Sequence, residues 1–124
     1  MRVNVDHLPQ VQQDELARAV RILMEEFDEA VNMSAKELEE WLQTEESREV
    51  GQKDGGGESR GHESGRRIVE ILEKDRDDYT EDDVSHMRDV VSYVHRHQAQ
   101  RPEGDVEDTN WRYSLINWGH DPLK

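Results

Sequence analysis

The residues best placed to do chemistry stand at the end of a glycine-rich stretch, residues 51–65, where an apolar helical pattern begins. This stretch holds six of the eight glycines and ends in Ser64 and Gly65, with Arg66 and Arg67 directly after it. We predict that a helix begins at Ser64 or Gly65, which places both arginines in its first turn. The N-terminus of a helix binds anions through free N–H groups and a partial positive charge, and cations are unfavourable there. The two arginines therefore indicate a nearby negative charge, which we interpret as a phosphate of nucleic acid or of a nucleotide.

The same two arginines also allow a plainer interpretation, in which they form ion pairs inside the protein. Glu58, Glu63 or Glu70 could pair with them, as could carboxylates on another helix. The stretch does not match the phosphate-binding loop of P-loop proteins, because no Gly-Lys-Ser or Gly-Lys-Thr follows it and no strand precedes it. The sequence leaves both interpretations open.

The histidines do not predict a metal site. His86 and His97 fall on one side of an expected helix, but three turns, about 16 Å, separate them, so they cannot share an ion. His95 and His97 point in different directions, because residues two apart on a helix do not face each other. Tyr93 lies on the flank with His86 and His97, which could form either a polar binding face or hydrogen bonds across a helix interface.

Catalytic groups are not evident either. Ser64 stands beside His62 and Glu63, but sequence neighbours rarely form a catalytic triad, and a serine at this place is better suited to cap a helix. The chain has no cysteine, which excludes disulfides, zinc–thiolate sites and a cysteine nucleophile. We expect a non-enzymatic protein without metal or cofactor.

The elements that position these residues are expected to be helices, because apolar residues recur at intervals of three and four. We predict an all-α single small domain of four to five helices, with a glycine-rich loop between the second and third helices. Residues 1–31 form a lead and first helix, and residues 32–124 form the helical domain. The expected helices run from Pro9 to about Val31, from a capping box of Ser34 with Glu37, from Ser64 or Gly65 to about Lys74, from Thr80 (with Asp83) to before Pro102, and through Trp111, Leu115 and Trp118 to a stop at Gly119.

Composition limits the partners. The net charge is −14, and the 16 basic residues are 12 arginines and four lysines, a halophile-like balance. Proteins that bind nucleic acid by neutralising phosphates usually carry a basic stripe, but molar salt shortens the Debye length to about 3 Å and weakens this objection. No apolar run approaches the length of a membrane span, and the start does not resemble a signal peptide, so we expect a cytoplasmic protein.

From about Glu26 to its end, the chain resembles a small microbial family known as domain of unknown function 3140. The segments that carry the resemblance are EFDEAVNMSAKELEEWL, GQKDGGGESRGHESGRRIVEIL, HMRDVVSYVHRHQAQRP and DTNWRYSLINWGHDPLK. Some members of that family are labelled DNA-binding protein, and the resemblance supplies no catalytic residues. The lead, DHLPQVQQDELARAVRILMEEF, separately resembles the helical segment found before nucleotidyltransferase or HEPN-type domains, although neither domain follows here.

Three functions follow, in order of preference. The first is association with nucleic acid, and with DNA in particular, through Ser64, Gly65, Arg66 and Arg67, helped by His95, Arg96, Gln100 and Arg101. The second is a protein-interaction or homo-oligomerising module, in which the acidic helices and the tryptophans engage a partner and the arginines are internal ion pairs. The third is an enzyme that acts on a phosphorylated small molecule. The discriminating observation is whether the guanidinium groups surround a concave space or already pair with carboxylates.

Overall fold

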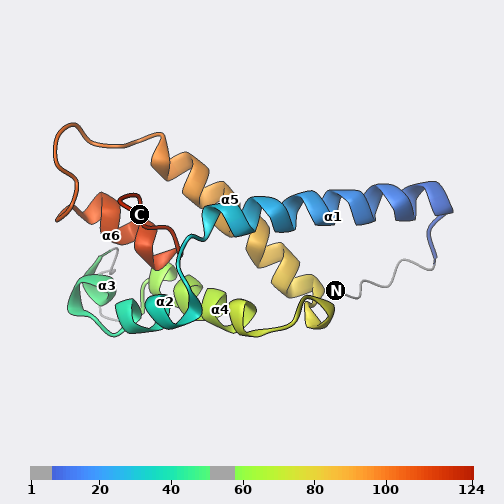
Figure 1. The fold of residues 1–124 in the computed structure, drawn as a ribbon, viewed down its shortest axis with the longest axis horizontal. Coiled ribbons are helices and arrows are strands. Elements are labelled where there is room, and N and C mark those ends of the chain that lie inside the picture. The colour runs from blue at the N-terminus through green and yellow to red at the C-terminus, as the bar shows by residue number, and fades with distance from the viewer. Residues whose placement is uncertain (1–6, 51–57) are drawn as a thin grey trace.

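The predicted all-α class is confirmed by a computed structural model, which describes residues 7–50 and 58–124. Within these ranges the chain forms helices and no strand (Figure 1). The helices are α1 (Gln10–Ala30), α2 (Ala35–Leu42), α3 (Glu45–Glu49), α4 (Arg60–Glu73), α5 (Glu81–Gln98) and α6 (Asn110–Asn117), with a 3-10 turn at Arg76–Asp78.

The helices pack as two pairs, α1 with α5 and α2 with α4, and α6 contacts helices of both pairs. Helix α5 packs across α1, while α4 lies beside α2 (Figure 1). Helix α6 contacts α2, α3, α4 and α5, so it closes the space between the two pairs. Apolar residues buried at this meeting point form one core, which includes Phe27, Leu38, Ile68, Ile71, Met87, Val90, Val94, Leu115 and Trp118.

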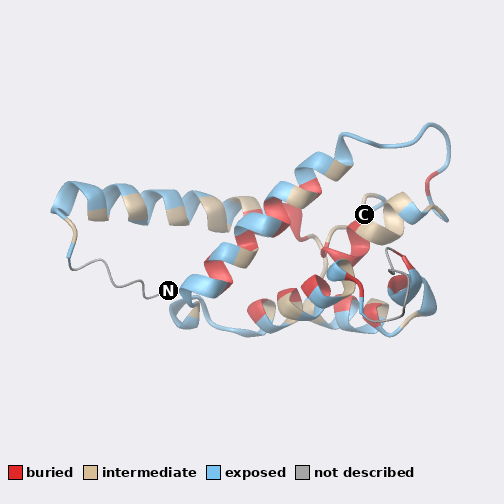
Figure 2. Cartoon of the chain, turned by 180° about the vertical axis from the view of Figure 1, so that it is seen from behind, coloured by how far each residue is buried: buried red, intermediate tan, exposed pale blue. Residues whose placement is uncertain are grey.

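Burial is uneven along α1. Its C-terminal end supplies Phe27 and Ala30 to the core, whereas its N-terminal half extends beyond the other helices and carries mostly exposed and half-buried residues (Figures 1 and 2). The helix begins at Gln10 after an N-cap Pro9, one residue later than predicted.

Three predicted helix ends are confirmed by their geometry. Both capping boxes are complete: Ser34 pairs reciprocally with Glu37, and Thr80 with Asp83. Helix α6 ends at Asn117 with Trp118 as its C-cap, and the next residue, Gly119, has a φ of +82°, which is accessible to glycine and strained for other residues.

The predicted start of the helix at Ser64 or Gly65 is wrong. Helix α4 begins at Arg60, and the Ser59 hydroxyl accepts a hydrogen bond from the His62 N–H as its N-cap. Gly65 therefore lies inside a helix, where its low intrinsic propensity is outweighed by tertiary packing. The first part of the glycine-rich stretch, residues 51–57, lies outside the described residues, and the short helix α3, which was not predicted, precedes it.

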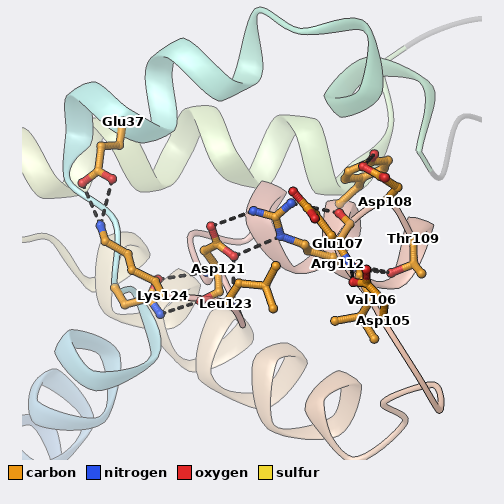
Figure 3. A network of polar contacts seen from close by, with 12 residues as sticks. Glu37, Asp105, Val106, Glu107, Asp108, Thr109, Arg112, Asp121, Leu123 and Lys124 are labelled. Atoms are coloured by element: carbon orange, nitrogen blue, oxygen red, sulfur yellow. Dashed lines mark hydrogen bonds and ion pairs between the residues drawn. The ribbon is translucent and has the colours of Figure 1, made fainter.

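The C-terminal segment fixes α6 through polar contacts (Figure 3). The Arg112 guanidinium donates to both carboxylate oxygens of Asp121 at 3.1 Å and to the carbonyl oxygen of Glu107 at 2.9 Å. The Lys124 ammonium group reaches the Glu37 carboxylate on α2 at 2.8 Å. These contacts tie the segments on either side of α6 to the helix and to α2.

Candidate functional site

The two arginines that suggested a phosphate site lie in the middle of α4, not in its first turn. The electrostatic argument that pointed to them therefore does not apply, because it depended on a helix start four or five residues further along. Arg66 donates to both carboxylate oxygens of Glu58, with its Nε 2.7 Å from Oε2. These hydrogen bonds lower the pKa of Glu58 to about 2. Arg67 lies 3.3 Å from the buried carboxylate of Asp83 on α5.

Gly65 serves packing. A Cβ atom at this position would lie 2.6 Å from the backbone oxygen of Asn117 and 2.6 Å from Cδ2 of Leu42. Real Cβ atoms do not approach backbone oxygens so closely, so this residue allows α4 to touch both α6 and α2. Gly65 is itself buried and presents no side chain to a ligand.

Ser64 and Arg67, on the neighbouring faces of α4, line a small cavity, which we call the hollow. Its volume is about 170 Å³, and its lining also includes Arg60, Glu63, His86, Asp89 and Trp118. The Ser64 hydroxyl lies 2.9 Å from Nε2 of His86. Burial lowers the pKa of His86, which favours the neutral imidazole, and this form can share a hydrogen bond with the hydroxyl.

The Ser64–His86 contact lacks the third group of a catalytic triad. In a triad, a carboxylate orients the histidine through its second ring nitrogen. Among the residues that the structure describes, His86 forms no ion pair with a carboxylate. The arrangement therefore gives no support to a serine nucleophile.

A larger cavity, which we call the cleft, adjoins the hollow between α4, α5 and α6. Its volume is about 430 Å³, within the range of pockets that hold small ligands. Its lining combines arginines, hydroxyl groups and aromatic rings: Arg60, Arg96, Ser92, Ser114, Tyr93 and Trp118. Arg60, Asp89 and Trp118 line both cavities, so the cleft and the hollow meet at these residues.

Five aromatic side chains form one ring stack along this side of α5. In order they are Trp111, His97, Tyr93, Trp118 and His86, with ring centroids 6.1, 5.1, 4.3 and 6.2 Å apart. The planes of neighbouring rings differ by only 12° to 17°. The spacing of His86, Tyr93 and His97 marked this flank in the sequence, but the insertion of Trp118 from α6 was not predictable from spacing.

Guanidinium groups lie against two rings of the stack, Trp111 at one end and Trp118 next to the other end. The Arg101 guanidinium carbon is 5.5 Å from the Trp111 ring centre, and that of Arg60 is 6.0 Å from Trp118. Such distances allow cation–π attraction. Inside the stack, Nε2 of His97 is buried and finds no hydrogen-bond partner in the described parts of the chain. Burial also lowers the pKa of His97, which favours its neutral form.

The structure brings together only part of the predicted site. Ser64 and Arg67 line the hollow, and Arg96 lines the cleft, where its Nε is 3.4 Å from the carbonyl oxygen of Ser92. Arg101 lies at the far end of the ring stack. The remaining predicted residues, Gly65, Arg66, His95 and Gln100, line neither cavity. Sequence reasoning missed Arg60 and Trp118, and it named His86 only as part of a flank with Tyr93 and His97.

Two further searches cover the described residues only. In residues 7–50 and 58–124, no three histidine, aspartate or glutamate side chains are grouped so that they could hold a metal ion. None of the helices in these ranges is long and apolar enough to cross a membrane.

The model of a family described as "Protein of unknown function (DUF3140)" matches residues 26–116. Except for Asn117 and Trp118, this range includes the residues of the ring stack and the lining of both cavities. This match begins after most of the N-terminal segment, so it does not show the resemblance of that segment to nucleotidyltransferase or HEPN-type proteins. No curated protein and no solved structure matches the chain significantly.

Proposed function

Because the chain belongs to the DUF3140 family, whose description assigns no activity, we propose its function from the cleft and the hollow: a non-enzymatic protein that binds nucleic acid by holding one nucleotide of a strand. The base lies against the aromatic wall of the cleft, and a phosphate lies in the hollow. The observation that carries this proposal is the junction of the two cavities at Arg60 and Trp118, where cationic and aromatic groups share one concave surface.

The hollow offers groups suited to a phosphate. Arginine binds phosphate through paired N–H donors, and Arg60 is free to turn, since its side chain is 75% exposed and lies 3.9 Å from Asp89. Arg67 can also turn toward an anion at low cost, because Asp83 retains the Lys74 ammonium at 2.7 Å. If Arg67 turns away, the buried carboxylate of Asp83 stays paired with Lys74, so no buried charge is left without a partner.

The cleft offers groups suited to a base. Tyr93 and Trp118 line the cleft, and the faces of both rings are occupied by their neighbours in the ring stack. A base can therefore lie against the edges of these rings, and the hydroxyl groups of Ser92 and Ser114 supply hydrogen bonds to base or sugar. A concave cleft of this size suits an unpaired nucleotide, because a base in a duplex is stacked and cannot enter.

The acidic charge of the protein limits the number of phosphates that it can contact. With a net charge of −14, binding cannot depend on a long basic track. If two phosphates are neutralised, the logarithm of the affinity should fall with the logarithm of salt concentration with a slope of about −1.4. This shallow dependence distinguishes a local nucleotide site from general phosphate neutralisation.

The test compares two variants that remove the same charge. Binding of a fluorescent single-stranded oligonucleotide is measured by anisotropy between about 50 and 200 mM salt. The double change Arg60→Ala, Arg96→Ala should weaken binding by about tenfold or more, as expected for the loss of hydrogen bonds to a charged group. The control Arg66→Ala, Arg76→Ala removes two exposed arginines that pair with Glu58 and Asp28 outside both cavities, and should change little.

Two further ligands test the specificity of the site. A duplex of the same sequence should bind more weakly than the single strand, and a mononucleotide should compete only at higher concentration. Absence of binding at about 50 mM salt would refute the proposal. A loss of binding confined to the control variant would contradict a site in the cleft and the hollow and would favour one that includes Arg66, which was among the residues predicted from sequence.

A further inference from the structure

Asp89, on α5, stands at the place where the cleft and the hollow meet. It lines both cavities, as do Arg60 and Trp118. Its neighbours on the same face of the helix line only one cavity each: His86 lines the hollow, and Ser92 lines the cleft. Because residues three apart in a helix lie side by side, the passage from the hollow to the cleft follows α5 past Asp89.

The sugar of a bound nucleotide belongs at this junction. In the proposed function, on which this inference rests, the phosphate occupies the hollow and the base occupies the cleft. A nucleotide joins its base to its phosphate through the sugar, so the residues that line both cavities are those nearest to the sugar. Of these residues, Arg60 and Trp118 carry only hydrogen-bond donors, whereas the carboxylate of Asp89 carries only acceptors.

The Asp89 carboxylate is able to accept hydrogen bonds from a ligand. Its side chain is 50% exposed, and its Oδ2 lies 3.9 Å from Nη2 of Arg60, which is too far for a hydrogen bond. Asp89 accepts no hydrogen bond from any residue that the structure describes. Asp83, on the same helix, differs in each respect: it is 2% exposed and accepts from the Lys74 ammonium and the Thr80 N–H.

We propose that the bound strand is RNA, and that Asp89 selects it by accepting a hydrogen bond from a ribose 2′-hydroxyl group. This hydroxyl is the group through which a protein distinguishes RNA from DNA at a given site. Acidic side chains bind the ribose 2′-hydroxyl in the same way in dinucleotide-binding folds. Within a strand the 3′-oxygen is esterified, so the 2′-hydroxyl is the one hydroxyl donor of the sugar, and deoxyribose has none. The choice of RNA departs from the preference for DNA that the sequence suggested.

The negative charge of Asp89 contributes to this selection. A carboxylate beside a phosphate repels a strand of either kind, and only a ribose compensates for the repulsion with a hydrogen bond. The same side chain therefore acts against DNA and in favour of RNA, and specific binding sites often combine an attractive and a repulsive element in this manner. Glu63 lines the hollow but not the cleft, so it adds repulsion near the phosphate and does not lie at the junction.

The test compares single strands of RNA and DNA that carry the same bases, with deoxyuridine in place of thymidine. Binding of each strand to the full chain is measured by fluorescence anisotropy at about 50 mM salt. RNA should bind about tenfold more tightly or better, as expected for a hydrogen bond to a charged group. RNA with 2′-O-methyl groups keeps the ribose oxygen but has no hydroxyl proton to donate, so it should bind about as weakly as DNA.

Two variants, each lacking one carboxylate, assign the preference to its residue. Asp89→Ala loses the hydrogen bond and the repulsion together, so it should bind RNA and DNA with similar affinity. Glu63→Ala is the matched control: it loses repulsion alone, so it should bind both strands more tightly and keep the preference for RNA. Both residues are exposed on helices, where alanine is well tolerated, and circular dichroism verifies that the helices are intact.

The outcomes separate the selection of RNA from the binding of a nucleotide. A preference for RNA that Asp89→Ala removes and Glu63→Ala retains supports the selection. Equal binding of RNA and DNA by the natural chain overturns it and leaves the nucleotide site in place. A preference that persists in Asp89→Ala also overturns it, as does a preference lost in both variants, which would indicate a general effect of charge. Absence of binding by either strand refutes the nucleotide site itself, and the selection of RNA with it.

Discussion

The end of α6 is held by hydrogen bonds to distant segments of the chain, whereas the first part of α1, residues 10–23, which we call the arm, has only local ones among the described residues. At the end of α6, Asn117 is 1% exposed and joins segments far apart in sequence. Its side-chain oxygen accepts hydrogen bonds from the Trp41 indole N–H and the Ser47 hydroxyl, and its amide donates to the Ser47 carbonyl oxygen at 3.0 Å. The side-chain hydrogen bonds of the arm are local, and join Gln10 to Asp14 and Gln13 to Leu8.

The end of α6 is therefore the more rigid of the two regions, whereas the arm keeps an accessible surface. The cleft and the ring stack are built on the end of α6, where several elements determine each position together, as a binding site requires. The arm depends on its own helical hydrogen bonds and on packing along one side, so its apolar surface remains open to a partner. The three predictions below test this contrast in order of expected effect.

Asn117→Ala should cause the largest loss of stability. It leaves the Trp41 indole N–H and the Ser47 hydroxyl without their acceptor, and each unsatisfied buried group costs about 1–3 kcal/mol. We expect the free energy of unfolding, measured by urea denaturation, to fall by about 3 kcal/mol or more. The matched control is Asn110→Ala, an exposed asparagine in the first turn of the same helix.

The asparagine control should change stability by less than about 0.5 kcal/mol, as is usual for surface substitutions. If both asparagine variants lose the same stability, the end of α6 is not the rigid part of the molecule, and the contrast with the arm fails.

Gly65→Ala should cause the next largest loss, because its Cβ would overlap the Asn117 backbone oxygen. Overpacking of this kind costs about 1–3 kcal/mol, and the gain in helix propensity offsets at most about 1 kcal/mol of it. The control is Gly61→Ala in the same helix, where the nearest atom to the added Cβ is Nε1 of Trp118 at 3.3 Å. Its unfolding midpoint should stay close to that of the wild type, and a larger loss at Gly61 than at Gly65 would contradict this account.

The glycines also explain which parts of the fold could be predicted from sequence. The capping boxes at Ser34 and Thr80 and the stop at Gly119 are local signals, and each was correctly located. The start of α4 was misplaced because Gly61 and Gly65 have low helix propensity. Their helical state depends on contacts with α6, which lies some 50 residues further along the chain, and propensity carries no information on such contacts.

The residues of the candidate site, like the helix boundaries, could be predicted only in part. Ser64, Arg67 and Arg96 were selected, although the reason given for Ser64 and Arg67 was wrong. The helical spacing of His86, Tyr93 and His97 placed them on one flank. What could not be predicted is the placement of Trp118 and Arg60 beside that flank, since it follows from the packing of α6 and α4 against α5.

Leu16→Ala in the arm should cause the smallest loss. Leu16 is only half-buried, so truncation creates little cavity, and we expect a loss below about 1 kcal/mol in dilute protein. The same truncation at Leu38, which is 0% exposed in α2, should cost about 2–5 kcal/mol. Both stability losses are measured by urea denaturation at a low protein concentration, which limits any association between copies of the chain. Equal losses would mean that the arm is as firmly held as the core. A loss at Leu16 that grows with protein concentration would instead show that the arm gains its order from a second copy, because association stabilises the folded state by mass action.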